Sequence, residues 1–138
     1  MTDENQDAAA AKQGPAILLL DDNAIQAATR QQILKRSGYF AIAALNPRRA
    51  LEQFQNNEYP AEIRAIVTDH IMPGMSGAEF VRELRRTHPH IPVMVISGLE
   101  EAEPLYEGMN VHFLLKPLPP EQLIAQLRNL LAGETRAA

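Results

Sequence analysis

Short apolar runs alternate with longer amphipathic segments along most of this chain. The runs lie at residues 16–20, 39–44, 65–68, 93–96 and 111–115, and each has the length of a strand. The first run is apolar at every position, which is typical of a central strand that helices cover on both faces. The alternation therefore predicts a parallel sheet enclosed between two layers of helices.

The first helix is expected from about Ala24 to Ser37, with Gly38 at its end. Apolar side chains recur within it at helical spacing, so one face should be buried in the core. The residues expected on that face are Ile25, Ala28, Ile33 and Leu34.

Three further helices should follow the second, third and fifth runs. They begin at Pro47, near Ala78, and at Pro120 or Glu121, with apolar stripes behind each start. After the fourth run only a short helix fits, because Pro104 stands in the middle of that segment.

The length of 138 residues is that of a single domain. Residues 1–14 are polar and alanine-rich without apolar periodicity, which predicts a disordered N-terminal tail. We expect the folded domain at residues 15–132 and a C-terminal tail at residues 133–138. No linker follows the domain, so it is expected to stand alone.

The composition narrows the classes of function. The chain has no cysteine, which excludes disulfides, thiolate metal sites and cysteine nucleophiles. Its net charge of -4 and its lack of basic runs argue against direct nucleic-acid binding. No apolar stretch is long enough to cross a membrane and no signal peptide is visible, so a cytoplasmic protein without membrane contact is expected.

Polar residues stand at the carboxyl ends of four predicted strands: Asp21 and Asp22, Asp69, Ser97, and Lys116. In an open α/β sheet the carboxyl edge is where ligands bind, so these residues should converge on one crevice. The acidic pair alone is equally well explained as a helix cap. The combination of the acidic pair with Asp69 favours a ligand-binding site over a helix cap.

Three carboxylates in one crevice repel each other unless a cation offsets them. Mg²⁺ prefers oxygen ligands, and carboxylates, water and a phosphoryl oxygen would satisfy it. A transferring phosphoryl group could then be stabilised by the metal, by Lys116 and by the hydroxyl of Ser97. Asp69 is the natural nucleophile, and its product would be an acyl phosphate.

These residues resemble the receiver domains of bacterial response regulators. The resemblance rests on Asp21-Asp22, on Asp69 with the following His-Ile-Met-Pro-Gly-Met-Ser-Gly segment, on Ser97, and on Lys116-Pro117. It covers about residues 16–131. It implies a flavodoxin-like (βα)5 fold, with a doubly wound five-stranded parallel sheet in the strand order 2-1-3-4-5.

The resemblance also implies a role for each matched residue. Asp69 would accept phosphate from a histidine kinase or a histidine phosphotransfer protein, and Ser97 and Lys116 would contact the phosphoryl group. Mg²⁺ would be held by Asp22, Asp69 and the backbone carbonyl of Ile71, with Asp21 assisting. The Lys116-Pro117 peptide bond would be cis.

A switch and an output surface are implied as well. Ser97 would move toward the phosphoryl group and Phe113 would pack inward, which alters the face around helix 4, strand 5 and helix 5 for a downstream protein. The chain would be a monomer or a weak dimer. It would not be an enzyme acting on other molecules, but a phospho-acceptor that assists its own phosphorylation and dephosphorylation.

The segment between Ser97 and Lys116 is a few residues shorter than the family pattern, which leaves the form of the fourth helix and of the output face open. Two functions other than phospho-acceptance are compatible with an aspartate at a strand end. A phosphohydrolase that uses an aspartyl phosphate needs a second acid two residues after the nucleophile, where this chain has Ile71. A receiver-like module that binds partners without phosphorylation remains the second hypothesis. The four histidines, His70, His88, His90 and His112, lack metal-ligand spacing and are assigned no role.

Overall fold

The computed structural model describes residues 16–137, so the expected N-terminal tail lies outside the described residues. Its strands are β1 (Ala16–Leu20), β2 (Phe40–Ala44), β3 (Ile63–Asp69), β4 (Val93–Ser97) and β5 (His112–Leu115). Its helices are α2 (Ala24–Arg36), α3 (Pro47–Gln55), α4 (Gly77–Thr87), the 3₁₀ helix η1 (Glu100–Tyr106) and α5 (Pro120–Ala137).

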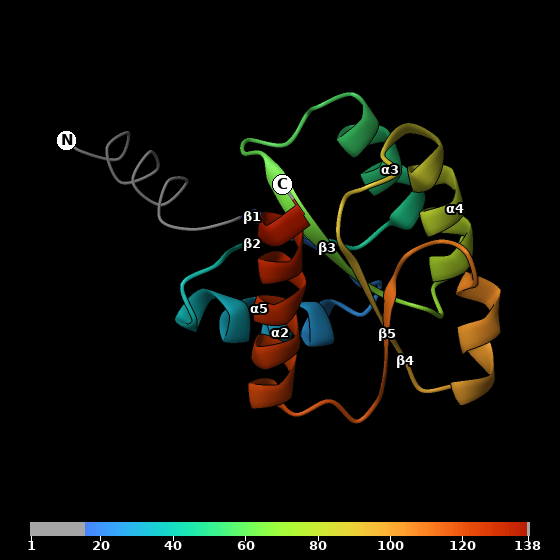
Figure 1. Ribbon diagram of the computed structural model, residues 1–138. Coiled ribbons are helices and arrows are strands. Elements are labelled where there is room, and N and C mark those ends of the chain that lie inside the picture. Colours follow the sequence, from blue (N-terminus) through green and yellow to red (C-terminus); the bar gives the residue numbers. More distant parts are fainter. Residues whose placement is uncertain (1–15, 138) are drawn as a thin grey trace.

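The strands form one parallel sheet in the order β2-β1-β3-β4-β5 (Figure 1). This is the flavodoxin-like arrangement that the resemblance implies. The chain moves from β1 outward to β2 and then returns across β1 to β3, so the strand order reverses between β1 and β3. Both strands end at this switch point, and it places the ends of β1 and β3 side by side.

The sheet separates two apolar cores. Leu18 and Leu20 of β1 face the layer that contains α3, α4 and Tyr106 of η1. Ile17 and Leu19 alternate to the other face, which α2 and α5 cover (Figure 1). Burial on both faces explains why β1, residues 65–67 of β3 and residues 93–96 of β4 are continuously apolar rather than alternating.

The predicted inner face of α2 is partly wrong. Ile25 is 80% exposed and Ala28 is also exposed, whereas Ala27 and Leu34 are the buried apolar residues of this helix. The helix is turned so that Gln26 and Arg30 reach the carboxylates at the ends of β1 and β3. Buried charges need donors, and this need outweighs the burial of one isoleucine.

The short segment after β4 is a 3₁₀ helix that contains Pro104. Its only buried side chains are those of Ala102 and Tyr106. At the other end of the domain, α5 continues to Ala137 and thus includes most of the residues expected as a C-terminal tail. Gly133 does not end it, since one glycine in a helix costs only about 1 kcal/mol.

Arg85 of α4 holds the loops at the amino-terminal edge of the sheet through hydrogen bonds. Its guanidinium donates to four backbone carbonyls in the loops that lead into β4 and β5, at 2.7–3.0 Å. These carbonyls belong to His88, Ile91, Met109 and Asn110. One side chain therefore fixes where two neighbouring strands begin.

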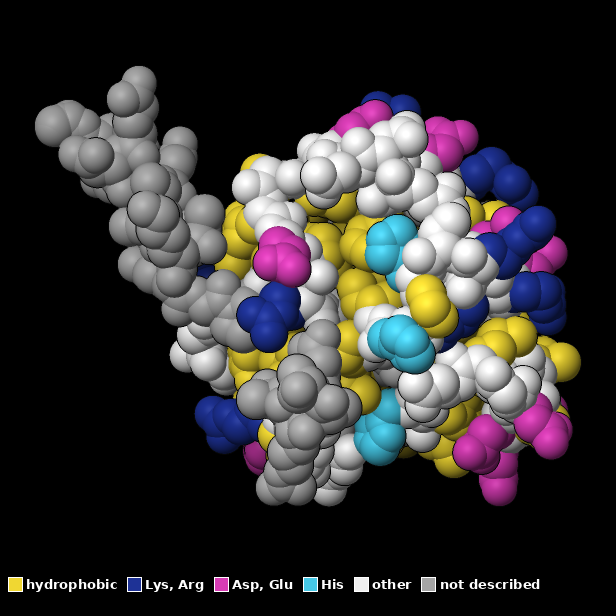
Figure 2. All heavy atoms as spheres, turned by 45° about the horizontal axis from the view of Figure 1, so that its top comes forward, with side chains coloured by type: hydrophobic (Ala, Val, Ile, Leu, Met, Phe, Trp, Pro, Cys, Tyr) yellow, Lys and Arg dark blue, Asp and Glu magenta, His cyan; other side chains and the backbone are white. Residues whose placement is uncertain are grey.

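Charges of both signs are interspersed around the rim of the face shown in Figure 2, and its centre consists mainly of hydrophobic, histidine and uncharged side chains. This face therefore offers no broad basic surface for a nucleic acid. None of the described helices combines the length and the apolar character that a membrane span requires.

Candidate functional site

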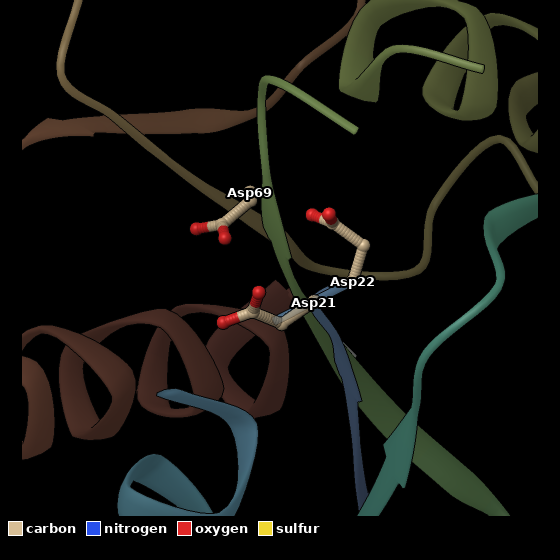
Figure 3. A group of neighbouring side chains, drawn as sticks. All are labelled: Asp21, Asp22 and Asp69. Atoms are coloured by element: carbon tan, nitrogen blue, oxygen red, sulfur yellow. The ribbon is translucent and has the colours of Figure 1, made fainter. Parts of the chain in front are cut away.

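The carboxyl edge of the sheet gathers three acidic side chains. Asp21 and Asp22 directly follow β1, and Asp69 is the last residue of β3. Their carboxylates turn toward a common space (Figure 3), and one oxygen from each lies within 4.8 Å of the others. The convergence predicted from the strand ends is therefore present in the structure.

Two of these carboxylates are deeply buried. Asp21 is 0% exposed and Asp69 is 4% exposed, whereas Asp22 is open to solvent. This difference in exposure follows from the sheet. Asp69 is the last residue of the central strand β3, and Asp21 directly follows the neighbouring strand β1. Two buried carboxylates this close require compensation from cationic or hydrogen-bonding groups.

Side chains of α2 supply most of that compensation. The Arg30 guanidinium donates to Asp69 Oδ1 at 2.9 Å and to Asp21 Oδ2 at 3.2 Å. The Gln26 amide donates to Asp21 Oδ2 at 2.7 Å and to Asp69 Oδ2 at 3.0 Å. Gln26 and Arg30 are four residues apart and thus project from the same side of the helix.

Asn23 joins the acidic pair to the start of this helix. Its side chain accepts the N–H of Gln26 as an N-cap, and its own N–H donates to Asp21 Oδ1 at 2.9 Å. Of the three residues Asp21-Asp22-Asn23, it is therefore Asn23 that caps the helix. Asp21 instead stabilises the loop and faces the site.

The two buried carboxylates have opposite pKa shifts. Burial raises the pKa of Asp21 to about 6. The hydrogen bond from the Asn23 N–H lowers this pKa, and the neighbouring Asp69 raises it further. Burial alone would also raise the pKa of Asp69, but the charge and hydrogen bond of Arg30 and the amide of Gln26 lower it. Asp69 is thus the carboxylate of the pair that stays ionised more readily, as a nucleophile must.

Lys116 approaches the same site from the end of β5. Its Nζ lies 3.5 Å from Asp69 Oδ1, and the Lys116-Pro117 peptide bond is cis, the geometry that the resemblance implies. The backbone N–H of Lys116 donates to the carbonyl of Ser97, which ties the ends of β5 and β4 together.

Ser97 ends β4, but its hydroxyl is engaged with its own loop. It accepts the N–H of Leu99 at 2.9 Å and is 3.2 Å from the Leu99 carbonyl oxygen, to which it donates. The side chain is buried together with the rest of the residue. The structure thus places Ser97 at the predicted edge of the sheet and shows its hydroxyl bonded to Leu99.

A second polar pair starts at the residue after Asp69. The ring of His70, 8% exposed, is hydrogen-bonded through Nδ1 to the Tyr106 hydroxyl at 2.6 Å. The Tyr106 ring in turn packs on Phe113, with centroids 5.7 Å apart. Burial lowers the pKa of His70 and raises that of Tyr106, so both groups are neutral near pH 7.

Gly77 makes this close packing feasible. A Cβ atom at this position would lie 2.5 Å from the Tyr106 hydroxyl oxygen and 2.6 Å from the Asp69 carbonyl oxygen. Both separations are far below a van der Waals contact, so the first position of α4 accepts only glycine here. Ser76, one residue earlier, forms a capping box with Glu79 that starts α4.

The acidic cluster fits a hard divalent cation. Three carboxylates offer oxygen ligands, and the exposed side chain of Asp22 leaves one side accessible to water. Ile71 follows Asp69 by two residues, and its side chain is 65% exposed. Its carbonyl as a further ligand remains a prediction from the resemblance.

Four residues of the site and its surroundings are not among the predicted site residues: Gln26, Arg30, His70 and Tyr106. The signal for the first two was the i, i+4 pair of long polar side chains just after the acidic pair. No local signal identifies the His70–Tyr106 pair, because its partners are 36 residues apart.

Sequence comparisons relate this chain to response regulators. The family profile described as the response regulator receiver domain matches residues 17–128. Response regulator MprA of Mycobacterium sp. (strain KMS) is 30% identical over 83% of this chain and 50% of its own length. The hydrogenase transcriptional regulatory protein HoxA of Cupriavidus necator is 28% identical over 89% of this chain and 25% of its own length. The chain thus spans half or less of these curated relatives.

Solved structures agree in fold. A response regulator receiver protein from Sinorhizobium medicae superposes with a TM-score of 0.76 at 28% identity, covering 88% of this chain and 97% of that one. A receiver domain protein from Clostridium thermocellum reaches a TM-score of 0.81 at 23% identity, covering 90% and 99%. The profile match spans most of the chain, so this protein belongs to the response regulator receiver domain family of two-component systems.

Proposed function

We propose that this domain accepts a phosphoryl group on Asp69 from a phosphohistidine of a histidine kinase or a histidine phosphotransfer protein. The observation that carries the proposal is the position of Asp69: a buried carboxylate with lowered pKa, between Lys116 and two further carboxylates. The proposed place of action is the cytoplasm.

Transfer of the phosphoryl group to Asp69 requires no general base. A carboxylate oxygen of Asp69 attacks phosphorus, and the bond from phosphorus to the donor nitrogen breaks. Its electron pair stays on that nitrogen, and the donor leaves as a neutral imidazole whose proton is on the other ring nitrogen. The carboxylate is already ionised, so no proton has to be removed from the nucleophile. Lys116 lies close enough to pair with an oxygen of the arriving phosphoryl group.

Asp21, Asp22 and Asp69 would hold Mg²⁺, with the Ile71 carbonyl as a further ligand. Bound there, the ion would offset the charge of the phosphoryl oxygens during transfer. Asp22 is the exposed member of the set, and Asp21 is positioned by the N–H of Asn23.

Signalling would follow from a rearrangement of Ser97. To donate to a phosphoryl oxygen, its hydroxyl has to leave the Leu99 carbonyl. We propose that this movement shifts Phe113 and the face formed by η1, β5 and α5, which a downstream protein reads. Phe113 already contacts Tyr106, so a change at Phe113 reaches η1 directly.

The test is the intact mass of the protein after incubation with acetyl phosphate, with Mg²⁺ or with a chelator, for wild type and Asp69→Ala. One added phosphate in wild type with Mg²⁺, and none in the other three samples, supports the proposal. No addition in any sample contradicts self-assisted phospho-acceptance and favours the second hypothesis, a receiver-like module that binds partners without phosphorylation.

A further inference from the structure

We propose that Arg30 is an internal counter-cation that holds Asp21 and Asp69 in the metal-free domain and has to be displaced when a divalent cation binds. This inference rests on the proposed function, because it concerns the same carboxylates. It adds a residue of α2 that regulates when the acceptor site becomes competent.

The contacts of Arg30 are those of a bridging cation. One nitrogen, Nη1, donates to a carboxylate oxygen of Asp69 and to one of Asp21. The Arg30 side chain is only 12% exposed, so the pairs are shielded from bulk water. Charge-assisted hydrogen bonds in such surroundings are stronger than those at an open surface.

All four oxygens of the two buried carboxylates already accept hydrogen bonds, three of them from Arg30 or Gln26 and the fourth from the Asn23 N–H. Asp69 Oδ1 accepts from Arg30 and Asp69 Oδ2 accepts from Gln26, while Asp21 Oδ2 accepts from both. A cation cannot occupy the position of a guanidinium on one oxygen while both keep full contact, because they repel each other at that distance. Binding of the cation and the Arg30 contacts are therefore competitive.

The charge balance supports this competition. Arg30 and Lys116 together offset two of the three carboxylate charges of the cluster. The metal-free site thus keeps only about one uncompensated negative charge, and the electrostatic attraction for a divalent cation is weaker than it would be beside three uncompensated carboxylates. The expected consequence is a folded resting domain that loads Mg²⁺ only at high concentration.

The experiment is a calorimetric titration with MgCl₂ at fixed ionic strength, on the full chain, for wild type, Arg30→Met and Arg82→Met. Arg82 is exposed on α4 and gives the same change of charge away from the site. We expect Arg30→Met to bind Mg²⁺ about tenfold more tightly, since hydrogen bonds to charged groups no longer have to be broken. Arg82→Met should match wild type.

Thermal melting of the same proteins supplies a second readout. Arg30→Met should melt below wild type in chelator and gain more than wild type when Mg²⁺ is added. A nuclear magnetic resonance titration of wild type avoids the variant altogether: the Arg30 Nε–H signal should change as Mg²⁺ binds, in step with the calorimetric saturation.

Four outcomes would contradict this inference. Equal Mg²⁺ affinity of wild type and Arg30→Met, or an Arg30 Nε–H signal that Mg²⁺ leaves unchanged, would overturn the counter-cation role while the proposed phospho-acceptor function stands. Absence of Mg²⁺ binding in both proteins would overturn the metal site and this inference together. Weaker binding by Arg30→Met would show that Arg30 supports the loaded site rather than competing with it.

Discussion

Arg30 and Arg85 are anchored at opposite edges of the same sheet and show how differently the two edges are built. Arg85 donates to four backbone carbonyls before β4 and β5, which are neutral partners that any sequence would provide there. Arg30 donates to two buried carboxylates after β1 and β3, which are partners that exist only because of this particular sequence.

We infer from this difference that Arg85 has a structural role and Arg30 a functional one. At the amino-terminal edge, an arginine donates to partly buried or exposed backbone carbonyls, and its contribution does not depend on ligands. At the carboxyl edge, an arginine compensates a charge concentration that is itself unfavourable for folding. Variants at the first edge should change stability alone, and variants at the second should change chemistry or metal dependence.

The largest expected effect is that of Lys116→Met. Loss of the ammonium 3.5 Å from Asp69 should slow phosphorylation by acetyl phosphate about 10²-fold, because a donor to the phosphoryl oxygens is lost. The time course of phosphorylation by intact mass measures this. Lys35→Met, an exposed lysine on α2, is the matched control, and a similar rate for the two variants would exclude the role of Lys116.

Arg85→Met should lower the free energy of unfolding by about 2–3 kcal/mol, since several carbonyls lose a charged donor. Urea denaturation with and without Mg²⁺ measures it, and the loss should be the same in both conditions. A loss that Mg²⁺ restores would contradict the separation of the two edges, since Arg85 has no contact with the acidic cluster.

Asp21→Asn should stabilise the metal-free domain at pH 7 by on the order of 2 kcal/mol. Because the pKa of Asp21 is raised from 3.8 to about 6, its contribution favours folding at low pH and is lost as the pH rises through 6. The gain of the variant over wild type should therefore grow between pH 4 and pH 7. A gain that is independent of pH in chelator would refute a raised pKa.

Tyr106→Phe tests the pair that links the acceptor strand to η1. Removal of the hydroxyl leaves buried His70 Nδ1 without its partner and should destabilise the domain by about 1 kcal/mol. Tyr59→Phe is the control, because its buried hydroxyl has no hydrogen-bond partner in the described part of the chain. Equal effects of the two substitutions in urea denaturation would show that the His70 contact contributes nothing.

The sequence was most informative where burial alone decides the structure. The runs that became β1, β3 and β4 are covered on both faces, so their apolar continuity predicted strands and sheet type. The residues just past these strands then predicted the acidic crevice, because parallel strands bring their carboxyl ends together.

The sequence was least informative where partners are remote. The inner face of α2 could not be read from Ile25 and Ala28, because the side chains that point to the site are polar and their partners include Asp69, 43 and 39 residues away. The four carbonyl partners of Arg85 could not be read either, since backbone groups leave no trace in side-chain patterns.

The central claim, that Asp69 is the acceptor, is tested most directly by locating the acyl phosphate. Borohydride reduces an aspartyl phosphate to homoserine, which mass spectrometry of peptides can assign to one residue. We predict homoserine at position 69 alone, in protein treated with acetyl phosphate and Mg²⁺, and none after treatment with chelator. Homoserine at Asp21 or Asp22, or at no aspartate, would contradict the account.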